Sequence, residues 1–102
     1  MSQKTIMLVC AAGMSTSLLV NKMQKSAEEK GLDAKIFATA SADAESKIES
    51  EHPDVLLLGP QVRYMLDDFK NSVSIPVEVI NMQDYGMMNG EKVLQQALNL
   101  IK

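Results

Sequence analysis

The chain has 102 residues, 46% of them hydrophobic and 23% charged, with a formal net charge of −3, which is typical of one soluble domain spanning residues 1–102. The negative charge and the scarcity of aromatic residues exclude nucleic-acid interfaces built on a basic surface or on stacked bases. No hydrophobic run is long enough to cross a membrane or to act as a signal peptide, so we expect a cytoplasmic, monomeric protein that does not insert into membranes.

The N-terminal third of the chain predicts a buried strand followed by a helix. Residues Thr5–Cys10 are almost all apolar, as expected of a parallel strand covered on both faces. An amphipathic helix is predicted over Thr16–Lys30, with Gly31 as its left-handed C-terminal stop. The apolar face of this helix carries Leu19, Met23 and Ala27.

The middle of the chain predicts an edge strand and a central strand. Side chains alternate in polarity over Leu32–Ala38, which favours a strand at the edge of a sheet. Ser41 is a candidate N-cap for a weaker helix that ends near Glu49. The run Val55–Leu58 is entirely apolar and predicts a strand in the middle of the sheet, ended by the Gly59–Pro60 pair.

The last part predicts two helices around one more strand. The first helix carries Val62, Met65, Leu66 and Phe69 on one face. A strand over Val77–Ile80 follows, and Asn89 is the expected cap of the last helix. The apolar face of that helix carries Val93, Leu94, Ala97, Leu98 and Ile101.

Alternating strands and helices predict an α/β fold with a four-stranded parallel sheet and helices on both faces. The two apolar strands belong in the middle, so the expected strand order is 2-1-3-4. In such sheets ligands bind outside the carboxyl ends of the strands, where the winding reverses between strands one and three. Residues 10–17, 59–61 and 81–85 should therefore meet at one rim.

Cys10 is the candidate nucleophile at this rim. It is the only cysteine, and with no Cys/His cluster in the sequence we expect no disulfide, no metal and no cofactor. The unpaired amides and positive dipole at a helix N-terminus favour a thiolate or a phosphate. The phosphate loop after the first strand would use the backbone and hydroxyls of Ala11, Ala12, Gly13, Met14, Ser15, Thr16 and Ser17.

Two other phosphate chemistries are disfavoured by what the loop lacks. No lysine lies between Lys4 and Lys22, so the loop is not a nucleotide-binding Walker motif. Cysteine phosphatases place an arginine six residues after the cysteine, and Thr16 occupies that position here. A small cysteine phosphatase or arsenate-reductase-like enzyme stays the alternative interpretation.

The segment Cys10–Leu18 resembles the phosphorylation loop of the enzyme IIB components of the lactose/cellobiose (diacetylchitobiose) branch of the bacterial sugar phosphotransferase system. The resemblance extends over essentially the whole chain, including Leu57–Val62. It implies a phosphotransferase in which Cys10 accepts phosphate from a phosphohistidine of a IIA protein. Cys10 would then pass it to a sugar, such as cellobiose or diacetylchitobiose, held by the membrane-embedded IIC permease.

Other polar residues have weaker claims to a role. Gln61 and Tyr85 are expected on neighbouring rim loops, where they are possible contacts of the phosphate or of a partner. His52, the only histidine, precedes Pro53 and is expected to be a solvated loop residue rather than a phosphate carrier.

Overall fold

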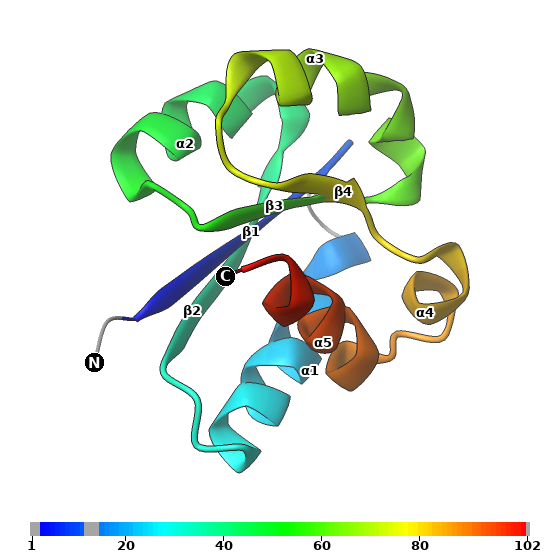
Figure 1. Ribbon diagram of the computed structural model, residues 1–102. Coiled ribbons are helices and arrows are strands. Elements are labelled where there is room, and N and C mark those ends of the chain that lie inside the picture. Colours follow the sequence, from blue (N-terminus) through cyan, green and yellow to red (C-terminus); the bar gives the residue numbers. More distant parts are fainter. Residues whose placement is uncertain (1–2, 12–14, 102) are drawn as a thin grey trace.

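The computed structural model describes residues 3–11 and 15–101 of the chain. Four parallel strands form one sheet in the order β2-β1-β3-β4 (Figure 1). The strands are β1 (Lys4–Cys10), β2 (Ala34–Ala40), β3 (Val55–Leu58) and β4 (Val77–Val79). The predicted strand order and the central position of β1 and β3 are therefore confirmed.

Helices cover both faces of the sheet, as predicted. They are α1 (Ser15–Glu29), α2 (Ala44–Glu51), α3 (Leu66–Ser72), α4 (Met82–Gly86) and α5 (Gly90–Leu100), with 3₁₀ turns η1 (Ser41–Asp43) and η2 (Pro60–Met65). Helices α1 and α5 lie on one face and α2 and α3 on the other (Figure 1). In the part of the chain that the structure describes, no helix is both long and apolar enough to cross a membrane.

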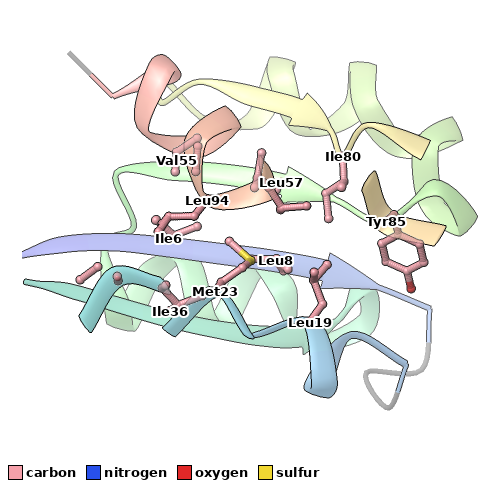
Figure 2. Packing of buried hydrophobic residues seen from close by; sticks show 14 residues of the cluster. Ile6, Leu8, Leu19, Met23, Ile36, Val55, Leu57, Ile80, Tyr85 and Leu94 are labelled. Carbon is pink, nitrogen blue, oxygen red and sulfur yellow. The ribbon is translucent and has the colours of Figure 1, made fainter. Parts of the chain in front are cut away.

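The core divides into two clusters because successive side chains of a strand point to opposite faces. Ile6 and Leu8 of β1 pack with α1 and α5, as Figure 2 shows, whereas Met7 and Val9 pack beneath α2 and α3. The predicted apolar faces of α1 and α5 are confirmed, with these residues fully buried: Leu19, Met23, Ala27, Val93, Leu94 and Ala97.

The boundaries of β2 differ from the predicted Leu32–Ala38 because Leu32 takes part in the turn that ends α1. Gly31 has a φ of 70°, which confirms it as the left-handed stop. The amide of Leu32 then donates to the carbonyl of Ala27 at 2.8 Å, and Gly31 donates to Glu28 at 3.1 Å. These two bonds satisfy the last helical carbonyls, so Leu32 belongs to the helix end and β2 begins two residues later.

The helix predicted from Ser41 is wrong in its start. Residues 41–43 form the 3₁₀ turn η1, and no side-chain hydrogen bond caps either η1 or α2. The helix predicted around Val62 is likewise divided into η2 and α3, and the two meet at Met65, whose backbone has φ −90° and ψ 1°. Inside η2 the backbone at Val62 has φ −116° and ψ 21°, outside the helical region.

Helix α4 was not predicted, because five residues are too short to display a 3.6-residue period. Its start is stabilised by Asn81 Oδ1, which accepts a hydrogen bond from the amide of Asp84 at 3.1 Å. The predicted cap of α5 is confirmed, since Asn89 Oδ1 accepts from the amide of Lys92 at 3.1 Å.

Candidate active site

Cys10 is the last residue of β1, at the carboxyl edge of the sheet between β2 and β3. It lies opposite Ala40 in the register of β1 and β2. On its other side the chain leaves β3 at Gly59, whose amide donates to the carbonyl of Val9 at 2.7 Å. The sulfur atom therefore lies at the reversal of winding where the sequence places the site. The side chain is 1% exposed.

Thr16 holds the thiol of Cys10 in place. Its Oγ1 lies 3.1 Å from Cys10 Sγ, within hydrogen-bonding distance, and either atom can be the donor. The carbonyl of Thr39 lies 3.8 Å from Sγ and can accept the thiol proton, in which case the Thr16 hydroxyl is the donor to sulfur. Thr16 is fully buried inside the first turn of α1, which begins at Ser15, so Thr16 itself is not the N-cap residue of the helix.

The start of α1 lies directly beside the sulfur atom. The amides of a helix's first turn have no carbonyl partners within the helix, and the dipole there is positive. A dianionic phosphoryl group on Sγ would therefore meet donors and favourable potential from α1, together with the Thr16 hydroxyl. The arrangement can bind a phosphate without an arginine.

Gly59 allows the chain after β3 to pass close to Cys10. A Cβ atom at this position would lie 3.7 Å from Cys10 Cβ and 3.0 Å from Gln61 Oε1, and the second distance is too short for relaxed packing. The missing side chain thus leaves room for Gln61 to fold back toward the β1 end. Gly59 was expected at the end of a strand and at the rim, but its close approach to Cys10 was not predicted; its place directly after the most apolar run is the signal for it.

Gln61 and Tyr85 meet at the rim, although 24 residues separate them. Gln61 Nε2 donates a hydrogen bond to Tyr85 Oη at 3.3 Å. Tyr85 is 9% exposed, and Figure 2 shows its ring at the end of the core cluster near the end of β1, with the hydroxyl directed out of the cluster. The two candidates are therefore coupled to each other, and Tyr85 lies on α4 rather than on a loop.

A hollow of 480 Å³ adjoins this pair. It is lined by Pro60, Gln61, Arg63, Tyr64, Met82, Tyr85 and Gly86. Two of these apolar side chains are unusually exposed, Tyr64 at 78% and Met82 at 59%. Exposed apolar side chains that gather in one patch are typical of a surface that binds another protein.

The structure describes only part of the predicted phosphate loop. Ala11 is exposed immediately after Cys10, and Ser17 is exposed in the first turn of α1. Ala12, Gly13 and Met14 lie outside the described residues. His52 is exposed and ends α2 with a left-handed backbone, which agrees with the interpretation of a solvated residue.

Replacing Thr16 by valine tests its contact with the sulfur. The change keeps the shape of the side chain and removes the hydroxyl group 3.1 Å from Sγ. A hydrogen bond to a charged group contributes about 1.5–3 kcal/mol, so we expect phosphocysteine to form about ten to a hundred times more slowly. Single-turnover phosphorylation followed by intact-mass spectrometry measures the rate.

The matched control is Thr16→Ser, which keeps the hydroxyl and should stay within a few fold of the wild-type rate. Urea midpoints close to that of the wild type in both variants would show that the fold is unchanged. A wild-type rate in Thr16→Val would mean that the hydroxyl does not contact the transferring group.

Comparison with known proteins gives matches over nearly the whole chain. Residues 5–96 match the family model described as "PTS system, Lactose/Cellobiose specific IIB subunit". The chain is 54% identical over 107 aligned positions to the PTS system galactose-specific EIIB component of Lactococcus lactis subsp. cremoris, covering 99% of each chain. It is 53% identical to the PTS system cellobiose-specific EIIB component of Lactococcus lactis subsp. lactis, with the same coverage.

A solved structure agrees with these sequence matches. The solution structure of the cellobiose-specific phosphotransferase IIB component protein from Borrelia burgdorferi is similar, with a TM-score of 0.81 and 44% identity. The match covers 98% of this chain and 93% of that one.

Proposed function

This chain belongs to the family of lactose/cellobiose-specific IIB subunits of the sugar phosphotransferase system, and from this we propose that Cys10 is the residue that carries the phosphoryl group. As a IIB component the chain is a phosphotransferase that relays phosphate toward a sugar, and such components work with IIA and IIC partners. The observation that supports Cys10 best is the position of its sulfur, 3.1 Å from Thr16 Oγ1 beside the start of α1.

The first step of the proposed relay is attack by the Cys10 thiolate on phosphorus of a IIA phosphohistidine. A sulfur–phosphorus bond forms, the nitrogen–phosphorus bond breaks, and the histidine nitrogen keeps the electron pair. The thiolate is the reactive form because sulfur attacks only after losing its proton. First-turn amides of α1 and the Thr16 hydroxyl bind the phosphoryl oxygens as they approach.

In the second step a sugar hydroxyl on the IIC partner attacks the same phosphorus. The new oxygen–phosphorus bond forms as the sulfur–phosphorus bond breaks, and the thiolate is regenerated. The proton of the sugar hydroxyl leaves to a base outside this chain. Gln61 and Tyr85, held together by their hydrogen bond, are proposed to contact the phosphate or the partner at the rim.

A relay must keep its phosphate until the acceptor arrives. In cysteine phosphatases an arginine fork stabilises transfer to water, but Thr16 stands at the corresponding position here and its hydroxyl contacts Sγ instead. The absence of an arginine at this position favours a relay over the alternative of a phosphatase.

The location, the oligomeric state and the sugar follow as further parts of the proposal. We expect a monomer that acts at the cytoplasmic face of the membrane, where IIC presents the sugar. The sugar is proposed to be a β-linked disaccharide such as cellobiose or diacetylchitobiose. Relatives with almost equal identity are named for galactose and for cellobiose. The choice of sugar must therefore be tested on a panel that contains galactose, cellobiose and diacetylchitobiose.

The decisive test compares the loss of phosphate from the purified phosphoprotein in two conditions. Alone in buffer the thiophosphate should persist, because the described contacts of Sγ include no arginine, histidine or carboxylate that could activate water. On addition of membranes containing the IIC partner and its sugar, phosphate loss should accelerate at least about a hundredfold, since the positioned hydroxyl replaces random encounter with water. Intact-mass spectrometry of the chain and assay of sugar phosphate follow both products.

Membranes without sugar are the control and should leave the phosphoprotein intact. Rapid turnover of a generic aryl phosphate, with no acceleration by membranes and sugar, would favour the phosphatase alternative.

A further inference from the structure

Helices α2 and α3 lie on the same face of the sheet (Figure 1). A hollow of 850 Å³ is lined by residues of both helices, and we name it the α2/α3 groove. The large apolar side chains that line it are Ile48, Met65, Phe69 and Val73. All four belong to the core cluster beneath these helices. Phe69 is buried, whereas Ile48, Met65 and Val73 are only partly buried. The groove thus presents an apolar floor to solvent.

The walls of the groove are acidic. Glu45 and Glu49 line it from α2 and Asp68 lines it from α3. Among the described residues that line it there is no lysine, arginine or histidine, although Lys47 and Lys70 lie on the same two helices. A segment that fills the groove should therefore combine apolar side chains with lysine or arginine.

This chemistry favours one of the two partners. Resting on the proposed function, we propose that the α2/α3 groove binds a basic, apolar segment on the cytoplasmic side of the membrane-embedded IIC partner. Cytoplasmic loops of membrane proteins are enriched in lysine and arginine, the charges that complement these carboxylates. The lipid surface itself is excluded as the occupant, because anionic headgroups would repel the three carboxylates.

The groove starts near the edge of the sheet that carries Cys10, but on the other face. Ser41, one of its lining residues, directly follows Ala40, the residue opposite Cys10 in the β1–β2 pairing. Sγ points to the α1 face through its contact with Thr16, so a segment bound in the groove does not cover the phosphoryl group. The hollow next to Gln61 and Tyr64 stays free in this arrangement.

The test uses the full chain and two double variants with equal changes in charge. Glu45→Gln with Glu49→Gln removes two carboxylates from the groove. Glu28→Gln with Glu29→Gln removes two exposed carboxylates from the C-terminal end of α1, on the opposite face of the sheet. Binding of each unphosphorylated protein to vesicles containing IIC is measured by co-sedimentation, with vesicles lacking IIC as the blank.

The groove variant should bind IIC vesicles about three to ten times more weakly than wild type, the effect of losing two exposed charge pairs. The α1 variant should stay within about twofold, and the difference should shrink in about 0.5 M salt because salt screens exposed charges. Phosphorylation of Cys10 by the soluble donor should be unchanged in both variants.

Several results would overturn the proposal. These are equal weakening by both variants, no weakening by either, no binding of the wild-type chain to IIC vesicles, equal binding to vesicles without IIC, or slower phosphorylation of the groove variant by the soluble donor. Failure of the proposed function would look different, because wild-type Cys10 would then take up no phosphate, whereas the binding measurement does not depend on phosphate.

Discussion

Replacement of Cys10 by serine is expected to abolish phosphorylation by the IIA donor and, with it, all transfer to sugar. A serine hydroxyl is far less acidic than a thiol, and no histidine or carboxylate among the described contacts of Sγ could act as its base. We therefore expect the rate of phosphate uptake to fall by more than about a thousandfold. Intact-mass spectrometry after incubation with the phosphorylated donor measures it.

The control for this experiment is His52→Gln. His52 is exposed at the end of α2, away from the carboxyl edge of the sheet, so the variant should be phosphorylated at the wild-type rate. Because Cys10 is buried, urea midpoints should be compared to show that serine leaves the fold intact. Unchanged labelling of Cys10→Ser, or phosphate found on His52, would remove Cys10 from its proposed role.

Replacement of Gly90 by alanine is expected to cause the largest loss of stability among single-methyl changes at the described glycines. A Cβ at Gly90 would lie 2.6 Å from the carbonyl carbon and Cβ of Lys22 and 2.7 Å from the amide nitrogen of Met23. These atoms belong mostly to the backbone of α1, so no side-chain rotation relieves the clash. Forcing α1 and α5 apart should lower the free energy of unfolding by about 3 kcal/mol.

The matched control is Gly86→Ala at the end of α4. An added Cβ there meets no atom within 4 Å, so the variant should be unchanged or slightly more stable. Urea denaturation at equilibrium compares the two variants, and a lower midpoint with an unchanged slope is the expected result for Gly90→Ala. Equal midpoints for both variants would show that α1 and α5 can separate without cost.

Much of the fold could be predicted because its signals are local. The apolar runs in β1 and β3 report burial on both faces of a sheet, and that burial places both strands in the middle. The spacing of Leu19, Met23 and Ala27 reports the buried face of α1. Strand order then follows from chain connectivity, and the location of Cys10 at the reversal of winding follows from strand order.

The errors arose where local patterns compete. The alternation of polar and apolar residues that begins at Leu32 fits a strand. The amide of Leu32, however, donates to the carbonyl of Ala27, so Leu32 is part of the turn that ends α1. Helix α4 is too short for its period to be visible. In both places a few backbone hydrogen bonds outweigh a weak pattern of side chains.

The fold, the position of Cys10 at the reversal of winding and the family of the chain were thus determined by the sequence itself, through patterns that repeat over a few residues and through one specific loop. The environment of the sulfur was decided only by tertiary structure. The carbonyl of Thr39 lies 29 residues from Cys10 in the chain, and it reaches Sγ only through the pairing of β1 with β2. Gln61 meets Tyr85 because Gly59 leaves room for a close approach and because α4 packs at the same rim. Such contacts depend on the register of strands and the course of loops, which local propensity does not specify.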